Sequence, residues 1–312
     1  MCRLLSKLFI SLFCLNLVFV ITPSFAEEGF IPVKNGKLYY QSFDDRPTII
    51  VIHGGPGLDQ SYLLPQMKEL AKRNPVIFYD QRSSGRSLPT TVNEKDMNVQ
   101  QFIQDIEALR QSLHINQFII LGHSWGGLLA SEYATQYPQH VSAMILLNSI
   151  PLTSTGFKAF ETEAQKRFQS ISTELEQIQS SQGFKQYDPK TYELFYRTIF
   201  STYVYDPKKV NNLTLSLTPI SAKNSAIIEN WFTKTYLSQP YDLRSKLKTI
   251  NVPTLVIAGN DDPVPVWTEK EISDALPHAK FVLITHCGHF PYFEQPAELF
   301  KHINQFLDEH PQ

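Results

Sequence analysis

A serine in a glycine-rich turn is the residue of this 312-residue sequence that best fits nucleophilic chemistry. Ser124 lies in the stretch GHSWGG (residues 122–127), which contains the pattern G-x-S-x-G. Residues 118–121 before it predict a short buried strand, and residues 128–137 after it predict a helix. A strand-to-helix turn of this kind pushes a serine hydroxyl out of the sheet, and its glycines relieve steric crowding. The stretch therefore predicts a nucleophile elbow, which needs an acid, a base and an oxyanion hole elsewhere in the chain.

Two aspartates follow the apolar residues 252–259 and are candidates for the acid. A serine hydroxyl is a weak nucleophile at neutral pH, so it needs a histidine base that a carboxylate orients. Asp261 and Asp262 both come after Ser124, as the chain order Ser, Asp or Glu, His requires. We favour Asp262 because it lies three residues after Gly259 and directly before a proline. Asp261 is the alternative, which we interpret as a loop residue or a turn cap.

Two histidines follow the predicted strand 279–285 and are candidates for the base. We favour His289, which lies further past the strand, where a loop can turn its ring toward Ser124. His286 is closer to the strand, so we interpret it as structural. His123 is next to the serine, but its side chain should point away from it in the elbow. We therefore interpret His123 as a packing or hydrogen-bonding residue.

The stretch HGGPG (residues 53–57) is the candidate for the oxyanion hole, which needs two backbone N–H groups where negative charge develops. The N–H of Trp125, directly after the nucleophile, is one expected donor. The N–H of Gly55, in a loop after an early strand, is the other. The Gly55–Pro56 bond is a candidate cis peptide, and we expect His53 to brace the loop without chemistry of its own.

Predicted strands and helices alternate along most of the chain, which indicates an α/β fold with a mostly parallel, twisted sheet and helices on both faces. The expected strands are residues 37–43, 48–53, 75–79, 118–121, 143–147, 252–259 and 279–285, and the expected helices are residues 62–73, 99–113, 128–137 and 296–306. Residues 151–242 have helical spacing and no convincing strand. We expect them to form a helical cap, inserted between a first core part (27–150) and a second one (243–312), at the sheet edge where ligands bind.

The first 26 residues have the features of a secretory signal peptide. Arg3 and Lys7 precede an apolar run, and Ser24-Phe25-Ala26 is a small-x-small site, so we expect cleavage after Ala26 and an exported protein, periplasmic or secreted. Removal of two basic residues would change the formal net charge from −2 to −4. We expect no membrane span after cleavage and no nucleic-acid partner. No metal or cofactor motif is present, and the sequence leaves the oligomeric state open.

These motifs together resemble the α/β-hydrolase fold and, within it, the prolyl iminopeptidase-like serine aminopeptidases. The motifs that carry the resemblance span most of the chain and are HGGPG (53–57), FYDQRSSGRS (78–87), GHSWGG (122–127), GNDD (259–262) and CGH (287–289). The resemblance implies that Ser124 is the nucleophile, Asp262 the acid and His289 the base. It also implies release of an N-terminal residue, often proline, from a short peptide. The alternative is an esterase, lactonase or amidase of the same fold acting on small molecules.

Two features of the sequence qualify this resemblance. Ser83 occupies the position after Asp-Gln-Arg where the family usually has glycine. The family also binds the free amine of its substrate through acidic residues of the cap. Glu229, beside a tryptophan, is the first candidate for that role, and Glu193 is the second.

Overall fold

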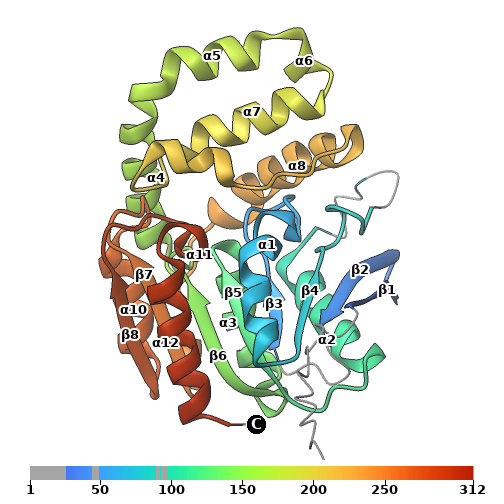
Figure 1. Ribbon diagram of the computed structural model, residues 1–312, viewed down its shortest axis with the longest axis vertical. Coiled ribbons are helices and arrows are strands. Elements are labelled where there is room, and N and C mark those ends of the chain that lie inside the picture. Colours follow the sequence, from blue (N-terminus) through green and yellow to red (C-terminus); the bar gives the residue numbers. More distant parts are fainter. Residues whose placement is uncertain (1–25, 44–48, 89–91, 93–96, 312) are drawn as a thin grey trace, which may run out of the picture.

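One sheet of eight strands forms the centre of the molecule in the computed structural model, which describes residues 26–43, 49–88, 92 and 97–311 (Figure 1). Its order is β1-β2-β4-β3-β5-β6-β7-β8. Both neighbours of β2 run antiparallel to it, and the other described pairs are parallel. The predicted mostly parallel sheet is therefore confirmed. The strands are β1 (Ala26–Val33), β2 (Gly36–Phe43), β3 (Ile49–Ile52), β4 (Val76–Tyr79), β5 (Phe118–His123), β6 (Val141–Leu147), β7 (Thr254–Gly259) and β8 (Ala279–Ile284).

Alternate residues of the central strands bury their side chains on opposite faces of the sheet, as the period of a strand requires. In β3, Ile50 and Ile52 pack with the helices α2 (Val99–Ser112), α3 (Trp125–Gln136) and α10 (Val266–Ala275). Ile49 and Val51 pack on the other face with α1 (Leu64–Met67) and α12 (Pro296–Glu309). Because both faces are covered, these strands are almost wholly apolar.

The carboxyl ends of the parallel strands meet at one edge of the sheet, and this edge positions the candidate site. β5 ends one residue before Ser124, and β6 ends one residue before Asn148. Asp262 follows β7, and His289 follows β8. Four polar side chains that are far apart in the sequence are thereby brought to neighbouring positions.

Two elements differ from the sequence prediction. The helix expected over residues 62–73 is a short α-helical turn, Leu64–Met67, between the 3₁₀ segments Gln60–Tyr62 and Lys68–Lys72. Pro65 lies in the first turn of the short helix, where proline is tolerated because its missing N–H would have no partner there. Strand β1 was not predicted, and it pairs along its whole length with β2.

The segment between β6 and β7 is helical where it covers the carboxyl edge of the sheet (Figure 1). Its ends lie together, because Thr153 and Asp242 form an antiparallel bridge and Leu243 N–H donates to the Leu152 carbonyl at 2.9 Å. We call residues 151–242 the cap, and its status as a separate unit remains a prediction. Its α-helices are α4 (Ser154–Phe168), α5 (Ser172–Ser180), α6 (Gln182–Lys185), α7 (Pro189–Phe200) and α8 (Pro219–Phe232).

Candidate active site

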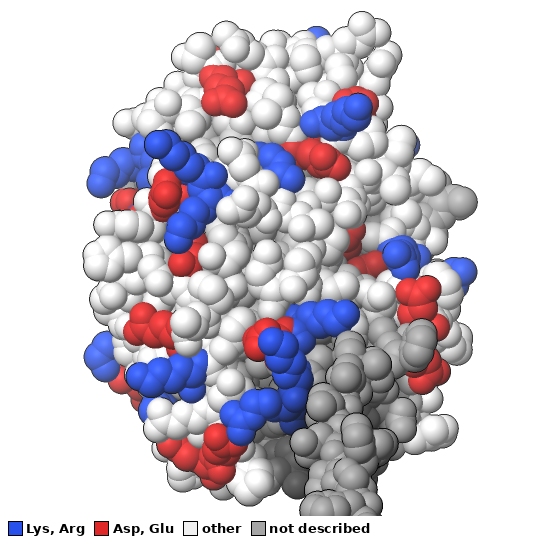
Figure 2. Space-filling model, in the orientation of Figure 1, with Lys and Arg blue, Asp and Glu red and all other residues white. Residues whose placement is uncertain are grey.

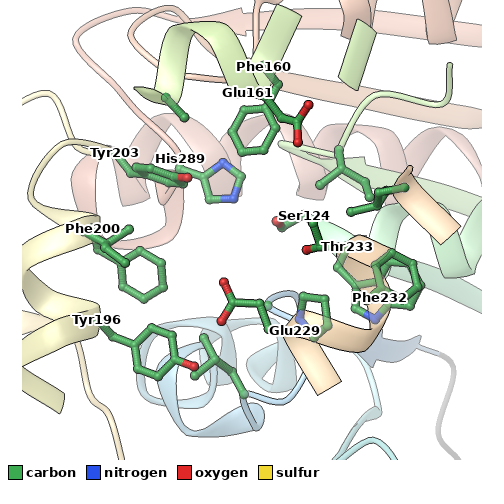
Figure 3. A pocket seen from close by; sticks show the side chains of 18 of the residues that line it. Ser124, Phe160, Glu161, Tyr196, Phe200, Tyr203, Glu229, Phe232, Thr233 and His289 are labelled. Atoms are coloured by element: carbon green, nitrogen blue, oxygen red, sulfur yellow. The ribbon is translucent and has the colours of Figure 1, made fainter. Parts of the chain in front are cut away.

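Ser124 occupies a strained backbone turn between β5 and α3, with φ 55° and ψ −121°. A residue other than glycine adopts a positive φ only where the surroundings enforce it, and such strain gathers at functional sites. The neighbouring glycines allow the turn, since a Cβ on Gly122 would collide with the Gly126 carbonyl group. A Cβ on Gly126 would collide in turn with the Ile52 carbonyl oxygen. The side chain of Ser124 faces a cavity that residues of both the core and the cap line (Figure 3).

Asp262 and His289 form a buried pair beside this cavity. The Nδ1 atom of His289 lies 2.8 Å from Oδ2 of Asp262, and both side chains are almost fully buried. The other carboxylate oxygen accepts a hydrogen bond from the Val264 N–H at 2.9 Å. Because an ionised carboxylate only accepts hydrogen bonds, Nδ1 carries the proton and Nε2 is left as an acceptor. The ring of His289 faces the same cavity as Ser124 (Figure 3).

The two alternative residues lie outside this arrangement. Asp261 is about half exposed, and its carboxylate lies 4.0 Å from the Arg167 guanidinium. His286 is exposed and packs edge-on against Tyr205. Neither residue lines the cavity that contains Ser124.

Asn148, which sequence reasoning missed, is a third polar partner of the buried pair. Its Nδ2 donates to Asp262 Oδ2 at 2.6 Å and to the Gly288 carbonyl at 3.0 Å. The residue is fully buried and has a φ of 45°. Its position directly after a buried strand is the same signal that identified Asp262, so the sequence could have indicated it.

The HGGPG loop lies against the serine. A Cβ on Gly54 would be 2.6 Å from Ser124 Cβ, so the loop backbone packs directly on the nucleophile turn. Gly55 and Trp125, the expected oxyanion donors, both line the cavity. The suggested cis bond before Pro56 is wrong, because the described residues contain no cis peptide. The turn instead takes its shape from Gly55, which has a φ of 54° and whose carbonyl accepts a hydrogen bond from the Leu58 N–H at 2.7 Å.

Gln81 connects this loop to the residue after the nucleophile. Its backbone N–H donates to His53 Nε2 at 3.0 Å, which leaves the His53 Nδ1–H to donate to the Gly54 carbonyl at 2.9 Å. Its side-chain amide donates to the His53 carbonyl at 2.6 Å and accepts from Trp125 Nε1–H at 3.0 Å. Burial lowers the pKa of His53 to about 4, so the ring is neutral at neutral pH and can accept the Gln81 N–H. This network holds the HGGPG loop and the Trp125 ring in a fixed relation.

A second chain of hydrogen bonds links the loop to the histidine of the buried pair. The Nε2 of His123 lies 2.9 Å from the His289 carbonyl oxygen, so Nε2 carries the proton and Nδ1 accepts from the Tyr62 hydroxyl at 2.8 Å. That hydroxyl in turn accepts the Gly54 N–H. Burial, and then the nearby His289, lower the pKa of His123 well below its usual value. His123 is thus a neutral hydrogen-bonding residue that positions the backbone of His289.

Ser83 has a φ of 62°, the left-handed conformation that glycine adopts at no steric cost. Its N–H donates to the Ser87 carbonyl at 3.0 Å, and its own carbonyl accepts from Asn224 Nδ2 of the cap at 3.1 Å. These backbone contacts hold the residue in place and do not need its side chain.

Replacing Ser83 by glycine should therefore stabilise the protein, by up to about 1 kcal/mol after the larger unfolded-state entropy of glycine is subtracted. Urea unfolding at constant m-value measures the change. Ser84→Gly is the matched control, because Ser84 is also buried but is not among the residues with a positive φ. The control should lose about 0.5–1 kcal/mol, and an equal loss in both variants would contradict the prediction.

The cavity above Ser124 has a volume of about 350 Å³ and lies between the core and the cap. Its walls are mainly aliphatic and aromatic, as those of pockets for small organic ligands generally are. Glu229 of α8 lines it and points toward its centre (Figure 3), whereas Glu193 of α7 does not line it. A second carboxylate, Glu161 of α4, also lines the cavity and was missed in the sequence.

Glu229 is an exposed residue of α8 whose carboxyl group faces the cavity. Desolvation raises the pKa of its carboxyl above the usual value, and a hydrogen bond from the Tyr196 hydroxyl partly offsets that effect. A cationic ligand group in the cavity would stabilise the ionised form of this carboxyl group. Among the described residues, no cluster of three or more His, Cys, Asp or Glu side chains could hold a metal ion.

Comparisons with known proteins agree with the fold. A family model described as the alpha/beta hydrolase fold matches residues 47–296. The proline iminopeptidase of Heyndrickxia coagulans is 29% identical over 293 residues, which cover 90% of this chain and 98% of that protein. The crystal structure of a proline iminopeptidase of Mycobacterium smegmatis is 20% identical with a TM-score of 0.66, covering 91% of this chain and 98% of that one. A 2-hydroxy-6-oxo-6-phenylhexa-2,4-dienoate hydrolase from a Rhodococcus strain is 19% identical with a TM-score of 0.68, covering 91% and 99%.

These relatives correct the prediction of an exported protein, periplasmic or secreted. Proline iminopeptidases of the kind that the chain matches are typically cytoplasmic enzymes. Residues 1–25, on which the prediction depended, lie outside the described residues, and Ala26 is already part of β1, opposite Phe43. Of the helices in the part of the chain that the structure describes, none has the length and apolar character to cross a bilayer.

Proposed function

Because the chain belongs to the alpha/beta hydrolase fold family, we propose that it is a serine hydrolase that releases N-terminal residues, with proline favoured, from short peptides. The observation that carries this proposal is the placement of Glu229 in the same cavity as Ser124 and His289, whose walls contain many aromatic side chains. A protonated amine that enters such a cavity needs a carboxylate partner, and a proline ring needs an apolar wall.

The proposed reaction proceeds through an acyl-enzyme. His289 Nε2 takes the proton of the Ser124 hydroxyl as its oxygen attacks the first carbonyl carbon of the peptide, and Asp262 stabilises the imidazolium that forms. The N–H groups of Gly55 and Trp125 would stabilise the negative charge on the carbonyl oxygen. His289 then protonates the leaving amine, and water releases the N-terminal residue by the reverse sequence.

A panel of substrates tests the proposal directly. Prolyl and alanyl arylamides with a free amine should be cleaved, the same compounds with a blocked amine should be poor substrates, and short-chain aryl esters serve as the comparison. Equal rates for free and blocked arylamides would refute the aminopeptidase proposal. Turnover of esters alone would favour the alternative, an esterase, lactonase or amidase acting on small molecules.

Replacing Glu229 by glutamine should raise the KM for free-amine arylamides by about 10- to 100-fold, because a desolvated charge pair is lost. The KM for aryl esters should change little. Glu193→Gln is the matched control, since Glu193 is on the neighbouring cap helix but outside the cavity. If Glu193→Gln has the larger effect, or if Glu229→Gln affects esters equally, Glu229 does not bind the amine.

The pH dependence provides an independent measurement of the same residue. The raised pKa of Glu229 means that its carboxyl is ionised only at a higher pH than usual. The KM for free-amine substrates should therefore fall as the pH rises through that pKa, until the amine itself loses its proton. Glu229→Gln should remove this fall, and its persistence in the variant would assign the titration to another group.

A further inference from the structure

The helix α4 contributes a second carboxylate to the cavity, for which the proposed reaction has no role. Four apolar residues of this helix line the cavity at helical spacing, and Glu161 lies on the same face: the apolar residues are Phe157, Phe160, Ala164 and Phe168. A glutamate on the solvent side of a cap helix would need no explanation. One on the apolar side faces whatever occupies the cavity, and Figure 3 shows the Glu161 carboxylate directed inward.

Among the described residues, this carboxylate has no partner in an ion pair or a hydrogen bond. Glu163 of the same helix pairs with Arg167 at 3.0 Å and with Lys166 at 3.7 Å. Glu161 makes no ion pair and no hydrogen bond with the residues that the structure describes, and it is only partly exposed. The protein therefore keeps an uncompensated negative charge at the wall of its cavity, which favours a cationic ligand group there.

Glu161 and Glu229 lie on opposite sides of Ser124 in the cavity (Figure 3). At the carbonyl that a serine attacks, the amine-bearing carbon and the leaving nitrogen also lie on opposite sides of the carbonyl carbon. If Glu229 holds the amine, the remainder of the peptide extends from Ser124 toward Glu161 and the α4 wall. The two carboxylates would then contact different parts of one substrate.

We propose that Glu161, with the apolar face of α4, forms a subsite for the residue that follows the cleaved bond. The subsite favours a lysine or arginine side chain at that position and disfavours an acidic one. This inference rests on the proposed function, because it uses Glu229 to define the direction of the peptide.

The face of the molecule drawn in Figure 2 has no region where one sign of charge dominates. Lys, Arg, Asp and Glu side chains are interspersed on the face shown in Figure 2, and the formal net charge of the whole chain is only −2. Discrimination between basic and acidic substrates should therefore come from the local carboxylate, with a dependence on ionic strength that reflects its partial exposure.

The test compares dipeptide amides whose second residues differ in charge but hardly in size. Prolyl-lysine amide is compared with prolyl-norleucine amide, and prolyl-glutamate amide with prolyl-glutamine amide. In the wild-type protein, lysine should exceed norleucine in kcat/KM by about 3- to 10-fold, and glutamine should exceed glutamate by a similar factor. Glu161→Gln should bring both ratios close to one, and added salt should reduce them in the wild type.

Glu176→Gln is the matched control, because it removes the same charge from an exposed position on the cap helix α5. It should keep the wild-type ratios. Unchanged ratios in Glu161→Gln would overturn the proposal. If kcat/KM also falls equally for the lysine and norleucine substrates, Glu161 binds the N-terminal amine instead. Urea unfolding of each variant excludes a folding defect as the cause.

A pair of esters separates failure of this inference from failure of the proposed function. If peptides and arylamides are not cleaved but esters are, the aminopeptidase proposal fails. The subsite is then tested with a butyrate ester of choline and with the ester of its neutral isostere, 3,3-dimethylbutanol. A preference for the choline ester that disappears in Glu161→Gln would support a cation subsite on the leaving-group side, and no preference would refute it.

Discussion

Ser124→Ala should lower kcat/KM for a prolyl arylamide by about 10⁵- to 10⁶-fold, the order of loss expected when a catalytic serine is removed. The cavity, the loop at Gly55 and the buried pair of Asp262 and His289 do not depend on the serine hydroxyl for any hydrogen bond found in the described residues. Folding should therefore be unchanged. Activity above about 1% of the wild type would show that another group is the nucleophile.

A second substitution at the same position separates catalysis from stability. Ser124 holds φ 55° and ψ −121°, which glycine adopts far more easily than serine or alanine. Ser124→Gly should be as inactive as Ser124→Ala, yet it should be more stable than that variant by about 1 kcal/mol. Urea unfolding of the two variants gives this difference directly. Equal stabilities would mean that the turn is not strained in the folded protein.

Much of the core could be predicted from the sequence because the same pattern, an apolar run followed by polar residues, marks both the strands and the candidate catalytic residues. Each buried strand ends where apolar residues give way to polar ones, and Ser124, Asp262 and His289 are all in such positions. Asn148 also follows a strand end, but an amide has no obvious role in nucleophilic catalysis until its partner is known. The ends of the predicted strands therefore located the edge of the sheet better than they identified the residues that position the acid.

The cap was harder to interpret because its functional residues depend on how helices dock. Glu193 and Glu229 look alike in the sequence, and only the packing of α7 and α8 places one outside the cavity and the other inside it. Glu161 carried a usable signal, since it interrupts the apolar face of an amphipathic helix.

Asp262→Asn should lower kcat by about 10⁴-fold while leaving KM within a few-fold, because it affects which histidine nitrogen carries the proton. Oδ2 of Asp262 accepts from both His289 Nδ1 and Asn148 Nδ2, and Oδ1 accepts from the Val264 N–H. An asparagine has one acceptor oxygen, so its NH₂ group must face a donor on one side or the other. If it faces His289, the proton moves to Nε2 and the base is lost.

Asp261→Asn provides the matched control, because Asp261 lies outside the cavity. Among the described residues, its carboxylate is paired only with Arg167. It should keep activity within about two-fold. A larger loss in Asp261→Asn than in Asp262→Asn would reverse the assignment of the acid. Near-UV circular dichroism of both variants would show whether the fold is retained.

A double-mutant cycle then measures what Asn148 contributes through Asp262. Asn148→Gly removes the amide without adding strain at a φ of 45°, and it should lower kcat by about 10-fold in the wild-type background, because Asp262 loses one of two hydrogen bonds at Oδ2. In the Asp262→Asn background the same change should cost little, since the carboxylate that Asn148 orients is already gone. A purely structural role would give equal losses in both backgrounds. Strong coupling in kcat with no change in KM would identify Asn148 as a positioning residue that acts on the histidine through the acid.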